Sequence, residues 1–236
     1  MTTEAARVEQ SASWYTSKQL DFDRRLVGFR FRSMLPHVSA KRVLELGSGD
    51  GVMTAMLAEH FELVTVVEGS RHLLEAVPDR PNLTKTHSLF EDFRPTEAFD
   101  AIIMEHVLEH VEDPVGILRM AIDWLAPGGV IVISVPNAHS FHRLAAVKMG
   151  MLPDVHALNA RDHELGHRRV YDWDSLRGDI EAAGLAVERM EGVFFKPLSN
   201  GQIDQHWSEE MIEGFYELGK DFPENAAEIT AICHRP

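Results

Sequence analysis

The sequence has a single cysteine, little positive charge and no long apolar run, and each of these shortages excludes a class of protein. Cys233 has no second cysteine to pair with, which excludes an internal disulfide framework, a cysteine-based zinc finger and an iron–sulfur cluster. The longest strongly apolar run, residues 130–135, is far too short to cross a bilayer. Because the first residues are polar and partly acidic rather than secretory in character, we expect a cytoplasmic protein.

Positive charge is scarce, with 23 Lys and Arg against 37 Asp and Glu and a formal net charge of −14. Such a chain repels a phosphate backbone and an anionic lipid surface, so we expect neither nucleic acid nor membrane as a partner. A composition with 44% hydrophobic and 25% charged residues is typical of a globular protein. The unusual excess is in histidine, of which the chain has 13.

Apolar runs and amphipathic segments alternate along the chain. Apolar residues recur at spacings of three and four before Pro36, which predicts an N-terminal helix. This helix carries Arg24, Arg25, Arg30 and Arg32, for which one alternative is that they hold an anionic acceptor. We interpret them as solvated side chains beside an apolar stripe. Short runs that suit buried strands follow at residues 42–46, 63–67, 101–104 and 130–135. Helix-like segments separate these runs, so we predict an α/β fold with a mainly parallel sheet.

Residues 138–171 interrupt this alternation with a His- and Arg-rich stretch that contains Pro153. Long stretches without an obvious strand usually form lids, so we predict a helical cap over the carboxyl ends of the strands. We expect the chain to divide into an N-terminal helical segment (1–40), a core (41–137), this cap, and the remainder of the core (172–236). Two closing apolar runs predict an antiparallel edge on the sheet.

Glycines at alternate positions separate the first apolar run from a helix: Gly47, Gly49 and Gly51. Glycine lets a backbone approach a ligand closely, and the helix that follows presents free N–H groups. Glu68 ends the second run, where a carboxylate usually holds a ribose diol. Val52 replaces the third glycine of the dinucleotide motif and disfavours a nicotinamide-dependent oxidoreductase, which we keep as an alternative. A further alternative is that the three glycines only form a tight strand-to-helix turn that binds no ligand.

Beyond the glycine loop and Glu68, motifs continue in order along residues 41–137. They are Ser88-Leu89-Phe90-Glu91-Asp92-Phe93, Phe99-Asp100, Glu105-His106-Val107-Leu108-Glu109-His110-Val111-Glu112-Asp113-Pro114 and Pro127-Gly128-Gly129. In this order they resemble the class I S-adenosylmethionine-dependent methyltransferases, and the motif at 105–114 is similar to the branch that methylates quinone precursors, sugars and natural-product scaffolds. The resemblance implies an EC 2.1.1 enzyme with a Rossmann-like, doubly wound, seven-stranded sheet that is mostly parallel.

The resemblance also implies S-adenosyl-L-methionine as cofactor. Because Trp14 and Tyr15 precede the N-terminal helix, we expect the N-terminal segment to close over this cofactor. The donor is a cation, which suits an acidic crevice. Leu89 and Phe90 would enclose its adenine. The full set of expected cofactor-binding residues is Tyr15, Glu45, Gly47, Ser48, Gly49, Gly51, Glu68, Gly69, Ser70, Leu89, Phe90, Glu91 and Glu105.

Histidines follow the fourth and fifth expected strands, where the methyl group would lie. Methyl transfer is an in-line displacement, and a base is needed only if the nucleophile carries a proton. Histidine is the natural base near neutral pH, so we predict catalytic roles for His106, His139 and His142.

Residues 163–167 match the H-E-x-x-H zinc pattern, with His163, Glu164 and His167 at the ligand and base positions. Gly166 weakens a helix, and the two arginines that follow would oppose a dication. We therefore expect no metal ligands, and keep a zinc-dependent hydrolase as an alternative. A cofactor-binding regulatory protein with a blocked methyl site is the non-enzymatic alternative.

Apolar side chains are scattered through the cap and the C-terminal segments, including Met149, Met151 and Trp207. They favour a bulky, partly apolar small-molecule acceptor that is methylated at an O, N or S atom. We expect a secondary metabolite such as an antibiotic scaffold, including a sulfur of a peptide disulfide or thioether, and hence a role in antibiotic biosynthesis. We expect a monomer or a homodimer.

Overall fold

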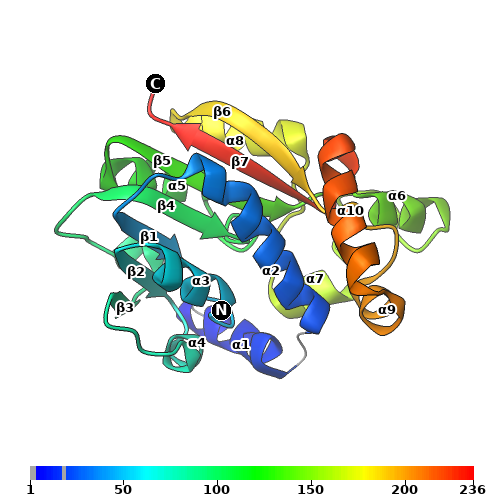
Figure 1. Cartoon of the computed structure of the whole chain (residues 1–236), viewed down its shortest axis with the longest axis horizontal. Coiled ribbons are helices and arrows are strands. Elements are labelled where there is room, and N and C mark those ends of the chain that lie inside the picture. Colours follow the sequence, from blue (N-terminus) through cyan, green and yellow to red (C-terminus); the bar gives the residue numbers. More distant parts are fainter. Residues whose placement is uncertain (1–3, 18–19) are drawn as a thin grey trace.

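The computed structural model describes residues 4–17 and 20–236, and its strands form one sheet. The strands are β1 (Arg42–Leu46), β2 (Leu63–Glu68), β3 (Leu83–His87), β4 (Phe99–Glu105), β5 (Leu125–Pro136), β6 (Ala186–Val193) and β7 (Glu228–His234). Their order in the seven-stranded sheet is β3-β2-β1-β4-β5-β7-β6 (Figure 1). Residues 1–3 and 18–19, part of the predicted N-terminal segment, lie outside the described residues.

Helices connect these strands and extend the chain beyond them. They are α1 (Glu4–Ser17), α2 (Asp21–Met34), α3 (Val52–His60), α4 (Arg71–Ala76), α5 (Pro114–Trp124), α6 (Phe141–Lys148), α7 (Ala160–Leu165), α8 (Trp173–Ala183), α9 (Asn200–His206) and α10 (Glu209–Asp221). Short 3-10 turns are η1 (Leu35–His37), η2 (Phe90–Asp92) and η3 (Pro223–Asn225). In the described chain, no helix combines the length and apolar character needed to span a bilayer.

The sheet is parallel from β3 through β5 and antiparallel at β7. This confirms the predicted Rossmann-like, doubly wound and mostly parallel sheet. The antiparallel strand is β7, which pairs with β5 on one side and with the edge strand β6 on the other. The strand order reverses at β1, because β2 lies on one side of it and β4 on the other. At such a reversal, connections leave to opposite faces of the sheet and open a crevice at the carboxyl ends of the strands.

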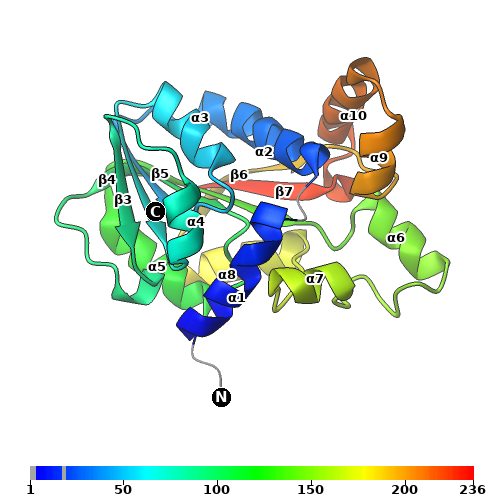
Figure 2. The ribbon, with the colours of Figure 1, turned by 90° about the horizontal axis from the view of Figure 1, so that it is seen from below.

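Both faces of the sheet are covered, which explains its continuous apolar strands. Neighbouring residues of β1 point to opposite faces: Val43 joins the core cluster that contains Met34 of α2 and Leu57 of α3. Leu44 joins the cluster that contains Leu118 of α5 and residues of α8. Figure 2 shows α2 and α3 on one side of the sheet and α5 and α8 on the other.

Residues 138–171, the predicted cap, contain α6 and α7, and α7 lies beside α1 (Figure 2). Asn159 begins α7 with a side chain that accepts a hydrogen bond from the Asp162 backbone at 3.0 Å. Gly166 ends the helix in the left-handed conformation, with φ of 81°. The division of the chain into functional parts stays a prediction.

Candidate active site

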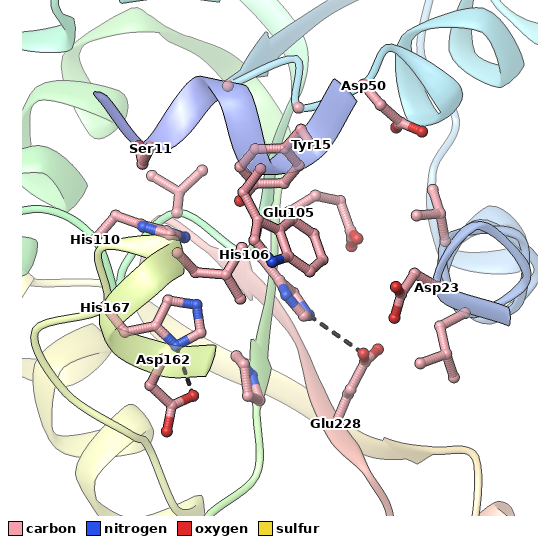
Figure 3. Close-up of a pocket in the computed structure, with 18 of the residues that line it drawn as sticks. Ser11, Tyr15, Asp23, Asp50, Glu105, His106, His110, Asp162, His167 and Glu228 are labelled. Carbon is pink, nitrogen blue, oxygen red and sulfur yellow. Dashed lines mark ion pairs between the residues drawn. The ribbon is translucent and has the colours of Figure 1, made fainter. Parts of the chain in front are cut away.

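A cavity of about 440 Å³ lies at the carboxyl ends of the parallel strands (Figure 3). Its wall includes Ser48 after β1, Glu68 at the end of β2 and Glu105 at the end of β4. Side chains of α1 and of the predicted cap complete the wall. The fold therefore brings the glycine loop, the ends of several strands and the cap around one space.

The glycine loop has a backbone that only glycine adopts readily. Gly47, Gly49 and Gly51 have φ values of 80°, 51° and 83°, in the left-handed region. A Cβ on Gly49 would lie 3.7 Å from the ring of Tyr15 in α1. Helix α1 thus covers the loop, and the first turn of α3 begins directly after Gly51.

Glu68 is buried, with its carboxylate fixed by backbone N–H groups of two loops. Its Oε2 accepts a hydrogen bond from Ser48 N at 2.8 Å, and its Oε1 accepts one from Ser70 N at 2.8 Å. A carboxylate has about four lone-pair sites. Acceptor capacity therefore remains on Glu68 toward the cavity, which fits a ribose diol.

Glu45 lies fully buried on the cavity wall. Among the described residues, neither of its carboxylate oxygens has a hydrogen-bond partner of good geometry, although the Thr54 hydroxyl lies close enough to offset a part of the cost of burial. Burial raises the pKa of Glu45 well above its usual value. A buried carboxyl group without partners is unfavourable, and a cationic ligand would relieve this cost. The site therefore fits S-adenosylmethionine, which carries an ammonium and a sulfonium group.

Most of the predicted cofactor residues lie on the cavity wall, namely Tyr15, Glu45, Gly47, Ser48, Gly49, Glu68, Gly69, Leu89, Phe90, Glu91 and Glu105. Gly51 and Ser70 lie behind it. Gly51 precedes α3, while the Ser70 side chain accepts a hydrogen bond from Leu73 N and begins α4. These two residues shape the loops rather than face the space.

A buried ion network, which the sequence analysis missed, connects α2 with the sheet. Arg30 donates to Glu105 through Nε, and its Nη1 lies 2.6 and 2.7 Å from the two carboxylate oxygens of Glu228. The Arg30 residue is only 6% exposed, so its interpretation as a solvated side chain is wrong. A signal was present, because Leu26, Arg30 and Met34 recur every four residues on one buried face. No comparable pattern in the sequence indicates that Glu228 takes part in this network.

His106 lies between two carboxylates at the centre of the cavity wall (Figure 3). Its Nε2 is 3.4 Å from Glu228 Oε1, and its Nδ1 is 3.5 Å from Glu109 Oε1. Burial and Arg30 lower the pKa of His106, but the two carboxylates outweigh them and raise it above its usual value. His106 has φ of 52°, and such backbone strain in a non-glycine residue is concentrated at functional sites.

The other two predicted catalytic histidines are placed differently. His142 lies on the cavity wall, and burial together with Lys196 and Arg143 lowers its pKa to about 2. His139 is exposed and faces the ring of His156 at 6.1 Å. The fold therefore brings His106 and His142 to the cavity and leaves His139 outside its wall.

The zinc-like pattern is divided by the end of α7. Because Gly166 leaves the helix, His163 and His167 do not lie on one continuous helical face. His163 and Glu164 are exposed, whereas His167 is buried with its Nδ1 3.2 Å from Asp162 Oδ1. Residues 160–167 therefore lack the helical geometry that an H-E-x-x-H site requires.

The cap end of the cavity carries a buried cation. Lys196 donates to Asn200 Oδ1 at 2.8 Å, and burial lowers the pKa of Lys196 to about 8. The neighbouring Arg143 is already bound to the Val155 carbonyl at 2.6 Å and to Asp162 at 3.4 Å. Polar groups thus line a space that is otherwise bounded by apolar side chains.

Comparison with known proteins gives consistent results. A family model described as a methyltransferase domain matches residues 21–189. The ubiquinone biosynthesis O-methyltransferase of Aeromonas salmonicida (strain A449) is 30% identical over 172 residues, covering 68% of this chain and 69% of that protein. The N-methyltransferase NodS from Bradyrhizobium japonicum WM9, solved with S-adenosyl-L-homocysteine, has a TM-score of 0.64 at 16% identity and covers 98% of this chain and 99% of its own. The CcbJ methyltransferase from Streptomyces caelestis has a TM-score of 0.64 at 16% identity and covers 99% of both chains.

The chain belongs to the class I S-adenosylmethionine-dependent methyltransferases. It is an EC 2.1.1 enzyme that methylates small molecules with S-adenosylmethionine as donor. The predictions of family, enzyme class and cofactor are confirmed.

Proposed function

We propose that this enzyme methylates an O, N or S atom of a bulky, partly apolar secondary metabolite, such as an antibiotic scaffold. The observation that carries the proposal is the continuity of the cavity. It runs from the partnerless Glu45 carboxylate, past His106, to His142 and Lys196 beside the cap. Donor and acceptor can therefore occupy one space, which would align the nucleophile with the methyl group.

Apolar side chains beside this end of the cavity support a bulky acceptor. Phe141 directly precedes His142 and is 46% exposed, and its ring lies 5.1 Å from that of Phe195. Leu198 is 40% exposed and lies one residue before the cavity residue Ser199. Apolar parts of a large acceptor that extend beyond the cavity would pack on these side chains.

In this proposal the cofactor supplies a methyl group on a cationic sulfonium centre. Glu68 holds the ribose, and Glu45 holds the cationic end, while Leu89 and Phe90 enclose the adenine. Tyr15 covers the glycine loop and excludes water from it. The proposed binding set also includes the remaining cavity-wall residues Gly69, Glu91 and Glu105.

His106 takes the proton of an O–H, N–H or S–H nucleophile, and Glu228 holds the imidazole toward the cavity. Arg30 in turn holds Glu228 through paired contacts. A positioned general base of this kind contributes about 10²- to 10⁴-fold to a rate. An acceptor sulfur in a disulfide or thioether carries no proton and would not use this base in methylation.

The test is to incubate the enzyme with a metabolite extract and methyl-labelled S-adenosylmethionine, followed by mass spectrometry. We expect one class of bulky small molecule to gain a labelled methyl group. Labelling confined to quinone precursors, or to small polar metabolites, would contradict the proposed acceptor class. A sulfur acceptor would be identified by labelling that survives in the His106→Ala variant.

A further inference from the structure

Three side chains that the proposed reaction does not use converge beside the cavity. Glu109 and His110 follow β4, and His167 follows α7. One potential ligand atom from each lies within 4.8 Å of the others. The rings of His110 and His167 have centroids 4.7 Å apart and lie edge to face (Figure 3). Segments almost sixty residues apart thus bring two imidazoles and a carboxylate together.

Glu109 is fully buried. Within residues 4–17 and 20–236, neither of its oxygens accepts a hydrogen bond, and His110 Nε2 also has no partner. The His106 ring is 3.5 Å from Glu109 Oε1, too far for a strong hydrogen bond. A buried carboxylate that has only this long contact with His106 is costly, and a bound cation would offset the cost.

The two imidazoles are already oriented as metal ligands usually are. His167 Nδ1 is 3.2 Å from Asp162 Oδ1, which leaves Nε2 as its ligating nitrogen. The Gly166 carbonyl hydrogen-bonds His110, whose Nε2 is the nitrogen that stays without a partner. A metal-bound histidine almost always gives its second nitrogen to a carboxylate or a backbone carbonyl.

The nearby arginines do not oppose a cation in the way the sequence suggested. Arg168 is paired with Glu4 at 2.7 Å, and its Nε donates to the His110 carbonyl. Arg169 donates to the carbonyls of Leu108 and Val111. Both guanidinium groups therefore hold the turn that carries Glu109 and His110.

We propose that Glu109, His110 and His167 bind a divalent transition-metal ion, with Zn²⁺ the best match, and that Asp162 orients His167. Two imidazoles and one carboxylate are a common ligand set for zinc and leave the fourth position open. His110 and His167 lie on the cavity wall, so this position faces the cavity. The proposed site differs from the H-E-x-x-H pattern of the sequence. It uses His167 but not the exposed His163.

The test is binding of Co²⁺ and Zn²⁺ to the full chain after dialysis against a chelator. We expect one ion per chain by elemental analysis, and a Co²⁺ absorption spectrum typical of tetrahedral coordination. His110→Gln and His167→Gln should each abolish this spectrum, and Asp162→Asn should weaken binding by about 10- to 100-fold. His163→Gln is the matched control, because its side chain is exposed, and should bind as the unaltered chain does.

Folding is monitored independently, because every variant must keep cooperative thermal unfolding and S-adenosylhomocysteine binding. Azide should shift the Co²⁺ spectrum, since the fourth position is open to the cavity. The absence of binding by the unaltered chain, or unchanged binding in both His→Gln variants, would overturn the site. A spectrum that azide does not change would overturn the open position. None of these readouts uses methyl transfer, so they are independent of the proposed acceptor.

Discussion

The two ends of the cavity are built in different ways. At the end proposed for the cofactor, Gly47, Gly49 and Glu68 come from consecutive strand–helix units, and the shape of the wall depends on the backbone. At the acceptor end, His106 and Glu228 come from strands β4 and β7, far apart in the sequence, and their contacts depend on side chains. In the proposed reaction the first end binds the methyl donor and the second end binds the acceptor.

The largest effect that distinguishes the two ends is expected from His106→Ala. Loss of the base should reduce kcat by about 100- to 1,000-fold for an acceptor that carries a proton. The Kd for S-adenosylhomocysteine should change little, because His106 acts at the acceptor end. Steady-state kinetics and calorimetry measure the two quantities, and His206→Asn on the exposed face of α9 is the control. An unchanged kcat in His106→Ala would show that His106 is not the base.

Glu45→Gln should have the next largest effect, and this effect should be on cofactor binding rather than on the reaction with the acceptor. Removing the charge should weaken S-adenosylhomocysteine binding by about 10- to 100-fold, as expected for a charge-assisted contact of about 1.5–3 kcal/mol. The free protein should become more stable, because a buried carboxyl group without partners is replaced by a neutral amide. Titration calorimetry and denaturant unfolding give the two values.

Glu62→Gln, at an exposed carboxylate outside the cavity wall, is the matched control for this pair of measurements. The account is contradicted if Glu45→Gln lowers stability and leaves affinity unchanged, because Glu45 would then serve the fold alone.

Lys196→Met tests the buried cation at the acceptor end through pH-dependent stability. The pKa of Lys196 is lowered by burial to about 8, from 10.5 in the unfolded chain. Between these values the unfolded chain binds the proton and the folded chain does not, so stability rises with pH. Relative to Lys196→Met, the unaltered chain should gain about 1–3 kcal/mol of unfolding free energy as the pH rises from 8 to 10.5.

Denaturant unfolding across this pH range measures the gain, with the exposed Lys148→Met as control. Parallel curves for the unaltered chain and the Lys196→Met variant would show that Lys196 titrates normally.

The smallest effect is expected from Tyr15→Ala, which uncovers the glycine loop. The ring lies at ordinary contact distance from the position of a Cβ on Gly49, so it packs on the loop there. Loss of its packing should weaken S-adenosylhomocysteine binding by about 2- to 10-fold, from about 0.5–1.5 kcal/mol. Calorimetry measures the change, and an effect larger than that of Glu45→Gln would place the main affinity in α1 rather than in the core.

The strands and the loop that form the glycine-loop end of the cavity could be predicted from the sequence, because their signals are local. Four apolar runs correspond to buried strands, and the glycine loop and Glu68 stand directly after two of them. Strand β3 has no apolar run, since it lies at the edge of the sheet and is largely polar, so its pattern alone did not indicate a strand.

The acceptor end was predicted only in part, because its contacts are tertiary. Arg30 appeared to be one of several surface arginines until the fold placed Glu105 and Glu228 against it. Likewise, His167 was paired in the sequence with His163, whereas the end of α7 turns it toward His110. The spacing of residues along the chain could not show which residues Arg30 and His167 contact in the folded protein.

The central claim is that donor and acceptor share one cavity, with the glycine loop at one end and the cap at the other. The most direct test is a crystal structure of the enzyme with S-adenosylhomocysteine and its methylated product. The account predicts the ribose at Glu68 and the new methyl group between the cofactor sulfur and His106. A product bound instead in the shallow site beside His163 and Glu164, outside this cavity, would contradict it.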